Sequence, residues 1–339
     1  MKTRILLSLL AAGVLLAGCS KSENEGGEGN GPVPGDGQLV AIRLSSGIGD
    51  ASKAGSKAPV TAEAPATVQI EGWENTEAET YEGASKWQST ASVKVLTQEE
   101  IAADGTANDI TLSPVQYYNA DEKIKTYIKG WYPAAKSAAG KVTFSTAEDD
   151  EKGYDYKGDG TDDVLLSNAV SGGKKEGEQI STPLVFDHVT TQLVFKVKKG
   201  DGLAEGTKIK TIKLKGGKIP SEIDLSSGTV TFTAPTEDDG KLDTKAEVKE
   251  ITEAATQAGV ALMVEETSDN DALTLFIETT VDGTNVAATY DNVKIKPTTG
   301  EGFKKGTAYS IEMTFKQTGI VLEANITPWT EATGEGEVI

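Results

Sequence analysis

Hydrophobic and polar residues alternate with a period of two along much of the chain after residue 38. The clearest case lies near the C-terminus, where apolar residues occupy every second position of 309–315 and again of 320–326. The segment between them contains Gly319, which suits a tight turn. Successive side chains of a strand point to opposite faces of a sheet. The pattern therefore predicts a β-hairpin over 309–326.

Shorter stretches with the same alternation predict further strands. They are 39–44, 67–73, 91–96, 109–118, 124–132, 141–145, 163–167, 193–197, 229–233 and 273–277. Helical patterns are weak: 97–103 fits one or two turns, and 244–257 fits either a helix or a polar surface excursion. Many short strands separated by turns predict an all-β protein built from β-sandwiches. The polar, Gly-rich stretch 168–182 marks a domain boundary, which we place between residues 178 and 179.

The N-terminus carries an export signal. Lys2 and Arg4 precede an apolar run over 5–16, which is too short to span a bilayer as a helix and fits a secretory signal peptide. The run ends in a Leu-Ala-Gly-Cys sequence that resembles the lipobox of bacterial lipoproteins. This predicts a signal peptide over 1–18 and acylation of Cys19; the alternative is an ordinary signal peptide with a chance cysteine. Residues 19–37 are acidic and Gly-rich, as in a flexible tether.

The charge and the scarce residue types exclude several functions. The 339 residues include 33 Lys and Arg against 52 Asp and Glu, a net charge of −19. Binding to nucleic acid needs a basic face, so nucleic acid is not an expected partner. The single Cys leaves no intrachain disulfide, and the single His removes most zinc and nucleophile–base chemistry. We expect a protein that is not an enzyme and needs no cofactor or metal.

A few residues are weak candidates for chemistry. His188, between an apolar run and a predicted strand, is a structural rather than a catalytic histidine in the favoured interpretation. Four aspartates in one loop could bind calcium through their oxygens, but their spacing does not fit an EF-hand, so a solvated turn is preferred. They are Asp155, Asp159, Asp162 and Asp163. The four tryptophans, which are expected to pack in cores, could also stack on sugars. They are Trp73, Trp87, Trp131 and Trp329.

Several short motifs in a fixed order resemble the fimbrillin family, the subunits of type V pili in Gram-negative gut and oral bacteria. After the lipobox come a strand at 39–46 and a basic residue followed by alanine, at Lys53 or Lys57. The later motifs are PVQYY at 114–118, IKGWYP at 128–133, DVLL at 163–166, LVFDH at 184–188, and a final hairpin that ends in ITPW at 326–329. The resemblance implies two tandem transthyretin-like β-sandwich domains, which would occupy 38–178 and 179–339.

The resemblance also implies a mode of assembly. A lipidated precursor reaches the outer membrane, a trypsin-like protease removes the first strand, and a strand from another pilin subunit fills the groove. The implied partners are other subunits, the outer membrane through lipid, the protease, and a host or bacterial surface ligand. The implied location is a fimbrium at the cell surface.

The cleavage site stays open between three residues. The family commonly cuts after Arg, and Arg43 is the only arginine near the first strand. Exposed loops are cut more readily than strands, which favours Lys53 and Lys57 in the following loop. The residues whose side chains would leave the core with the strand are Val40, Ile42 and Leu44.

Two other functions are alternatives to that of a pilus subunit in the shaft or at the tip. A stand-alone surface lipoprotein would bind glycans or other host ligands through exposed aromatic residues, and it would not need a removable first strand. A surface hydrolase is the weakest alternative, because the sequence holds no nucleophile–base set, although a pair of carboxylates suffices for glycoside hydrolysis.

Overall fold

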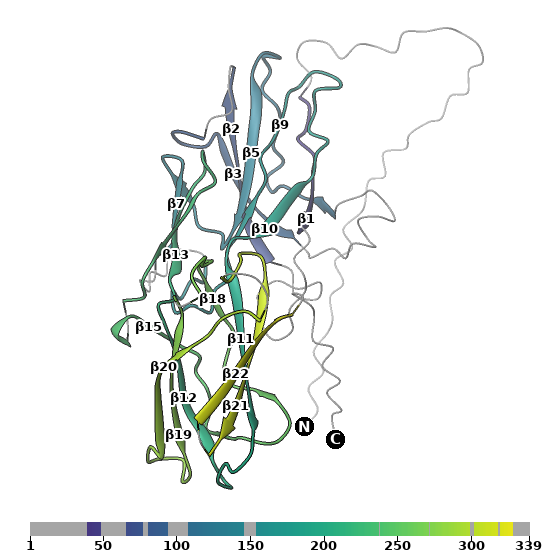
Figure 1. The fold of residues 1–339 in the computed structure, drawn as a ribbon. Coiled ribbons are helices and arrows are strands. Elements are labelled where there is room, and N and C mark those ends of the chain that lie inside the picture. The colour runs from purple at the N-terminus through teal and green to yellow at the C-terminus, as the bar shows by residue number, and fades with distance from the viewer. Residues whose placement is uncertain are drawn as a thin grey trace, which may run out of the picture. The chain divides into compact units, whose positions relative to one another are not determined.

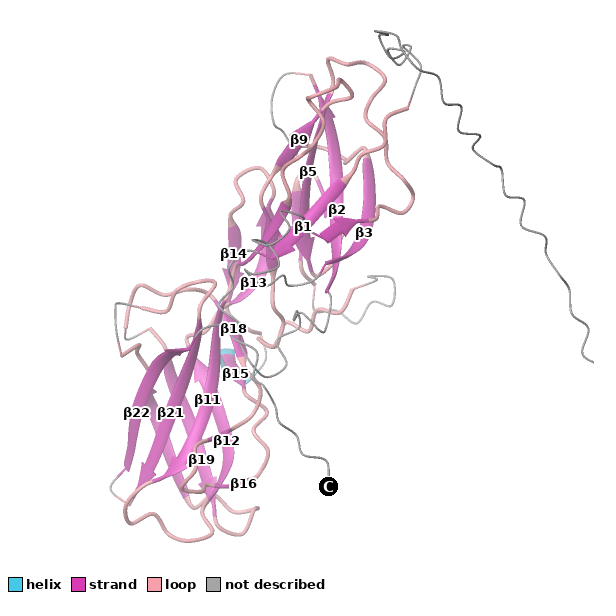
Figure 2. Cartoon of the chain, turned by 90° about the vertical axis from the view of Figure 1, so that its right-hand side faces the viewer, coloured by secondary structure: helices cyan, strands magenta, loops and turns pink. Residues whose placement is uncertain are grey.

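A computed structural model describes residues 39–48, 66–76, 81–93, 108–145, 154–236, 238–270, 272–298, 302–317 and 319–327. Within these ranges the chain is all-β, as predicted, apart from one short 3-10 turn, η1, at Asp238–Gly240 (Figure 1 and Figure 2). No helix among the described residues is long and apolar enough to cross a membrane.

The first half of the chain builds most of an eight-stranded sheet. Along the sheet the order is β3 (Trp87–Val93), β2 (Ala66–Asn75), β5 (Lys125–Tyr132), β8 (Leu165–Ser167), β10 (Leu184–His188), β1 (Leu44–Ile48) and β4 (Asn108–Ile110), and β9 (Val170–Gly172) also pairs with β5. The first strand in sequence is therefore an inner strand of the sheet.

A smaller sheet packs against one face of the eight-stranded sheet. It contains, in order, β14 (Val230–Thr233), β13 (Ile219–Asp224), β7 (Lys141–Thr143) and β6 (Ser137–Ala138). Trp73 and Trp131 from the large sheet share one buried cluster with Val142 and Ile223 from the small one. The alternation along each strand thus gives each sheet an apolar face, and the two faces form a sandwich.

The opposite face of the eight-stranded sheet encloses a second cluster, here called the first-strand cluster. Its members are Ile42, Leu44, Ala66, Val68, Ile70, Trp87, Ala91, Val93, Ile110, Leu112, Tyr118, Ile128, Leu165, Val170, Leu184 and Phe186. Gly130 lets β10 pack closely, because a Cβ at this position would lie 2.7 Å from the Phe186 ring. The central strands β2 and β5 of the large sheet are consequently buried on both faces along most of their length, whereas the edge strand β3 is exposed on one face.

Two further five-stranded sheets form a second sandwich. One contains β17 (Thr256–Gln257), β11 (Thr191–Lys199), β21 (Ala308–Lys316) and β22 (Gly319–Thr327), with β18 (Leu262–Val264) also on β11. The other contains β15 (Lys241–Asp243), β12 (Lys208–Lys215), β19 (Thr274–Thr280) and β20 (Ala288–Lys294), with β16 (Lys249–Glu250) also on β12. Phe195, Ile311 and Phe315 meet Ile212 and Ile277 in their shared core.

The predicted hairpin is confirmed, with β21 and β22 antiparallel and Tyr309 opposite Ile326. The weak helix signal at 244–257 is wrong, since that stretch holds β16 and β17. The domain boundary between residues 178 and 179 stays a prediction. Hydrogen bonding crosses it, because β10 pairs with β8 and β13 pairs with β7.

Candidate functional site

The N-terminal segment lies between two parts of the chain that are far from it in sequence. Strand β1 runs parallel to β10, with Ser46 opposite Leu184, and antiparallel to β4, with Leu44 opposite Ile110. Upstream, Ala41 forms an isolated bridge with Tyr117. This upstream pairing includes two hydrogen bonds, from the Ile42 amide to the Gln116 carbonyl at 2.8 Å and from the Tyr118 amide to the Val40 carbonyl at 3.0 Å.

The regular strand begins later than the sequence predicted. The prediction was 39–44, whereas β1 spans Leu44–Ile48. The partner segment has more residues between Ile110 and Tyr117 than the N-terminal segment has between Ala41 and Leu44, so the ladder is interrupted there.

The predicted alternation of side chains nevertheless holds along this segment. Ile42 and Leu44 are buried, and Val40 is partly buried against the same first-strand cluster. Arg43, between the two buried positions, is exposed. The three side chains expected to face the core therefore do so, and the basic residue points away from it.

The side chains around this segment form the walls of the space that it fills. Leu184 and Phe186 on β10 are fully buried, and Ile110 and Leu112 on the other side are nearly so. All four belong to the first-strand cluster together with Ile42 and Leu44. The sequence marked β10 as an apolar run, but nothing in it indicated that β10 and β1 are neighbours.

Several predicted residues lie outside the described part of the chain. They are Cys19, Lys53, Lys57 and Trp329. Acylation at Cys19 and cleavage at either lysine stay predictions.

Three of the four aspartates of the 155–163 loop, Asp159, Asp162 and Asp163, engage separate partners. Asp159 pairs with Lys245, and Asp162 accepts hydrogen bonds from the amides of Lys157 and Gly158 at 2.7 and 2.8 Å. Burial raises the pKa of Asp159, but hydrogen bonds from Lys245 and Thr161 outweigh it, and the net pKa lies below the usual value. Burial dominates at Asp162 and raises its pKa. Among the described residues no group of three or more His, Cys, Asp or Glu is placed to hold a metal.

His188, the last residue of β10, lies in the interior and contacts a buried carboxylate. Its Nδ1 lies 2.6 Å from Oδ2 of Asp163, and both side chains are almost completely buried. The Thr190 hydroxyl donates to the other oxygen of Asp163 at 3.2 Å. This contact ties the end of β10 to the acidic loop.

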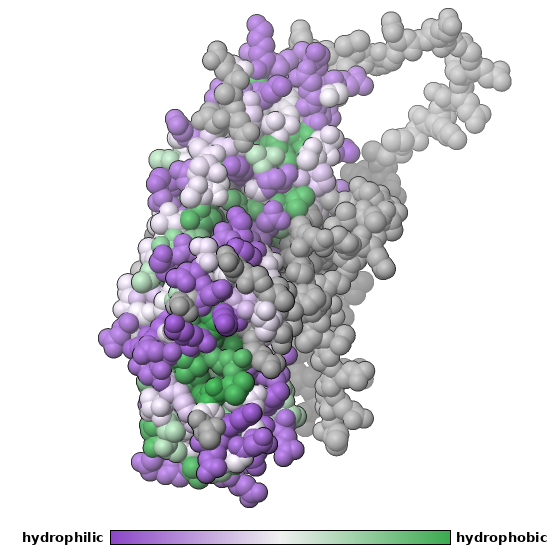
Figure 3. Space-filling model, in the orientation of Figure 1, coloured by the Kyte–Doolittle hydropathy of each residue, from purple (hydrophilic) through white to green (hydrophobic). Residues whose placement is uncertain are grey.

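The three described tryptophans are core residues. Trp131 is fully buried and donates through its indole nitrogen to the Ala135 carbonyl at 2.7 Å, and Trp73 and Trp87 are also buried. The face of the molecule in Figure 3 is mostly hydrophilic, with apolar residues gathered in a few patches. Tyr117, 42% exposed, is the one aromatic among the large hydrophobic side chains exposed in the described ranges.

Comparisons with known proteins agree with this architecture. The fimbrillin-like family matches residues 58–329, which is most of the chain. A search of curated proteins found no match. A candidate cell adhesion protein from Bacteroides uniformis has a similar fold, with a TM-score of 0.51 and 18% identity over 88% of this chain and 100% of its own.

Two other solved structures are similar at lower TM-scores. A fimbrial protein from Bacteroides vulgatus aligns with a TM-score of 0.42 and 16% identity over 78% of this chain and 93% of its own. A fimbrial assembly protein from Parabacteroides distasonis aligns with a TM-score of 0.41 and 11% identity over 85% of this chain and 100% of its own. The family match begins after β1 and covers all the strands from β2 to β22, which make up the rest of both sandwiches. The chain belongs to the fimbrillin-like family, which supports a non-enzymatic role as a fimbrial subunit at the cell surface.

Proposed function

We propose that the protein is a structural subunit, shaft or tip, of an adhesive surface fimbria. It is exported as a lipoprotein precursor anchored in the outer membrane through Cys19. A trypsin-like protease then removes the N-terminal strand, and a strand from another subunit replaces it. Its partners are other copies of the chain or related subunits, and adhesion engages a ligand on a host or bacterial surface.

The observation that carries the proposal is the position of residues 40–48. This segment lies inside a sheet, yet both of its neighbours, β10 and the 108–118 segment, come from later parts of the chain. Because this segment precedes all the other described strands, one cut after it would separate it and leave the chain continuous through the rest of the fold. The backbone groups it pairs with would lose their partners, and such unpaired edges accept a new strand readily.

The buried side chains supply the driving force for replacement. Ile42 and Leu44 are almost completely buried, and their loss would open two pockets in the first-strand cluster. Burial of one large aliphatic side chain contributes roughly 1.5–3 kcal/mol. Refilling both pockets therefore contributes about 3–6 kcal/mol before the cost of ordering the incoming strand.

The sequence leaves the cleavage site open between Arg43, Lys53 and Lys57. A cut after Arg43 would leave Leu44–Ile48, the whole of β1, attached to the chain, so only a cut at Lys53 or Lys57 removes this strand. The exposed side chain of Arg43 favours recognition by a trypsin-like enzyme, but its neighbours Ile42 and Leu44 are buried. A protease needs several residues of extended, accessible backbone, so local opening must precede a cut at Arg43.

Limited trypsin treatment of the soluble mature chain tests the mechanism. We expect a cut between Arg43 and Lys57 that converts monomer to oligomer. Mass spectrometry locates the cut, and size-exclusion chromatography detects the oligomer. The triple variant with Arg43, Lys53 and Lys57 replaced by Ala should remain a folded monomer. Polymerisation of this variant at the wild-type rate would contradict strand removal as the trigger. Electron microscopy of cells with antibody against the protein separately tests its presence in a fimbria.

Acylation is tested independently of assembly. Cells fed a fatty-acid analogue should label the wild-type protein and not Cys19→Ser. Equal labelling of both would exclude Cys19 as the lipid attachment site.

A stand-alone glycan-binding lipoprotein is the alternative function. In the sequence-based form of this alternative, exposed tryptophans stack on the glycan, and Trp73, Trp87 and Trp131 are buried and do not fit that role.

A further inference from the structure

A pocket of about 670 Å³ opens beside the second sandwich. Its floor is apolar, formed by Val197 on β11, Ile209 on β12, and Ala258, Val260 and Ala261 near β17 and β18. Val197 and Ile209 are 2% and 1% exposed, so the pocket reaches the core between the two sheets. Its volume lies in the range of roughly 300–1,000 Å³ typical of small-molecule sites.

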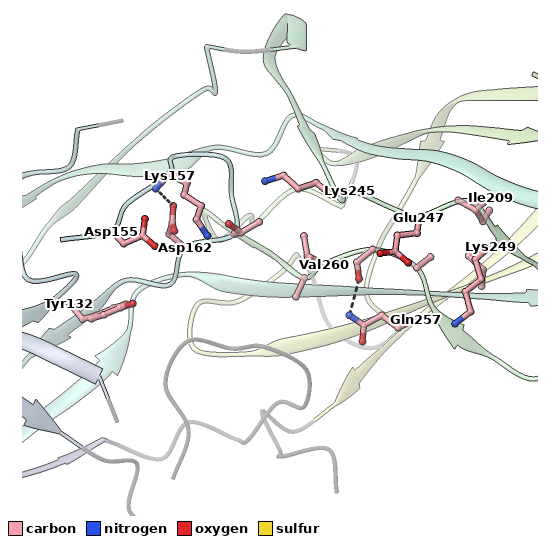
Figure 4. A pocket seen from close by; sticks show the side chains of 15 residues that line it. Tyr132, Asp155, Lys157, Asp162, Ile209, Lys245, Glu247, Lys249, Gln257 and Val260 are labelled. Atoms are coloured by element: carbon pink, nitrogen blue, oxygen red, sulfur yellow. Dashed lines mark hydrogen bonds between the residues drawn. The ribbon is translucent and has the colours of Figure 1, made fainter. Parts of the chain in front are cut away.

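Among the described residues the lining carries three charges of each sign, and one of the basic groups, Lys245, is paired with Asp159, which lies outside the lining. The acidic side chains are Asp155, Asp162 and Glu247, and the basic ones are Lys157, Lys245 and Lys249. Figure 4 shows that they are interleaved along the pocket and not separated into an acidic and a basic half. The lining therefore has no excess of basic groups that would select an anion.

The pocket has two distinct ends. In Figure 4, Tyr132, Asp155, Lys157 and Asp162 gather at one end, and Glu247, Lys249 and Gln257 at the other, with Val260 between them. Tyr132 is only partly buried, so its ring forms a wall of the cavity. A ligand that uses both ends is elongated and has an apolar middle.

Several polar groups at both ends have bonding capacity that their internal contacts do not use. Both backbone bonds to Asp162 go to Oδ2, so Oδ1 takes no part in them. Gln257 donates through its amide nitrogen to the Gly259 carbonyl at 3.0 Å, which leaves its amide oxygen out of that bond. Lys249 and Glu247 are exposed at the rim, so their charged ends are accessible.

We propose that this pocket binds a neutral carbohydrate, a short oligosaccharide lying along the cavity. Sugar hydroxyls both donate and accept hydrogen bonds, which suits carboxylates and ammonium groups placed side by side. The C–H faces of a sugar ring are apolar and fit the Tyr132 ring and the aliphatic floor. With Asp159, the partner of Lys245, the pocket has one more acidic than basic side chain, which disfavours an anion and is compatible with a ligand without charge.

The chemistry of the pocket disfavours other ligand classes. A phosphate, sulfate or sialic acid would meet three carboxylates, and a cation would meet three ammonium groups, within one small cavity. A zwitterion needs its two charges opposite separate charges on the protein, whereas here the two signs alternate. The carbohydrate thus deepens the adhesive role proposed above, on which its biological meaning rests.

Binding is tested with purified full-length, unassembled protein, so that failure to bind would leave the assembly mechanism untouched. The probes are maltose, cellobiose and lactose, with N-acetylneuraminic acid as an anionic comparison and the dipeptide Lys-Glu as a zwitterionic one. Saturation-transfer NMR and calorimetry should detect at least one neutral disaccharide and should show weaker or no binding of both charged probes.

Three variants separate the pocket from the rest of the surface. Tyr132→Ala and the double variant Glu247→Ala/Lys249→Ala should each weaken binding at least tenfold, and the double variant changes only exposed side chains. Tyr117→Ala, which removes an exposed aromatic outside the lining, should bind as the wild type does. Thermal melting of each variant checks the fold. The proposal is overturned if no neutral disaccharide binds, if a charged probe binds more tightly, or if folded pocket variants bind unchanged.

Discussion

The N-terminal strand and the C-terminal hairpin have the same alternating sequence pattern but are held in the fold differently. Strand β1 forms three register pairs with β10 and three with β4. Strand β22 forms nine pairs with β21, its immediate neighbour in sequence. The hairpin ladder closes over a short turn, whereas both ladders of β1 join segments separated by long stretches of chain.

The comparison shows that a strand that forms easily during folding is not the strand that is easiest to replace. Closing a short loop costs little conformational entropy, so the hairpin assembles locally. Strand β1 gains its contacts only after β4 and β10 are in place. The assembly mechanism proposed above requires a strand that one cut can separate from the fold. Strand β1 precedes all the other described strands and meets this requirement, whereas β21 lies between β20 and β22 in the chain and does not.

The largest effect is expected in the hairpin. Phe315 on β21 is fully buried in the second sandwich, so Phe315→Ala should lower the free energy of unfolding by about 3–5 kcal/mol. Guanidinium unfolding followed by far-ultraviolet circular dichroism, which reports on both sandwiches, measures the loss. Val321→Ala on β22, where the side chain is 48% exposed, is the matched control and should change stability by about 0.5 kcal/mol or less.

The corresponding change in the first strand should be of similar or smaller size but have a second consequence. Leu44→Ala should cost about 2–5 kcal/mol, because Leu44 is 4% exposed in the first-strand cluster. It should also speed tryptic cleavage near residues 39–48, measured by the rate of loss of intact chain. Phe315→Ala is not expected to accelerate that particular cut; equal acceleration by both variants would show that the two regions open together.

Hydrogen exchange sharpens the comparison without a substitution. Amides of residues 44–48 should exchange faster than those of 308–316, since local opening of β1 breaks fewer ladder pairs. Mass spectrometry of peptides from the intact protein measures both rates in one experiment. Slower exchange in β1 would contradict the idea that it is the replaceable strand.

The smallest effect depends on pH and concerns the first sheet. Tyr132 packs against the first-strand cluster, and burial, with help from Asp163, Asp162 and Asp155, raises its pKa to about 12. The ordinary tyrosine pKa is about 10. The folded state therefore holds this proton more tightly than the unfolded state, and the resulting stability is complete below pH 10 and declines from pH 10 towards 12. Tyr132→Phe should reduce that decline in unfolding experiments at pH 9 to 11.5. If the free energy of unfolding falls with pH equally in both proteins, the decline does not come from Tyr132.

Local patterns in the sequence were sufficient for much of the fold. The hairpin was visible because alternation and a glycine turn occur together over 309–326. Strand β12 was missed because a bulge between Ile209 and Thr211 breaks its period of two. Strand β20 was missed because it has few apolar residues and because Asn292 adopts a left-handed backbone conformation.

The sites were harder to predict than the strands. The inward set Val40, Ile42 and Leu44 follows from alternation alone, but its neighbours on β10 and β4 come from long-range pairing that no local pattern encodes. The pocket combines the end of β5, the 155–162 loop and the 244–261 stretch. The last of these was predicted in part as a polar excursion or a helix, so its role as a wall was not visible.

The parallel pairing of β1 with β10 has a consequence for the geometry of a filament. A strand that replaces β1 and keeps its ladders must run parallel to β10 and antiparallel to β4. Each incoming strand then enters the groove with the same direction, so successive subunits repeat one head-to-tail contact. A fimbria built in this way has two chemically different ends, and only one of them carries an unfilled groove.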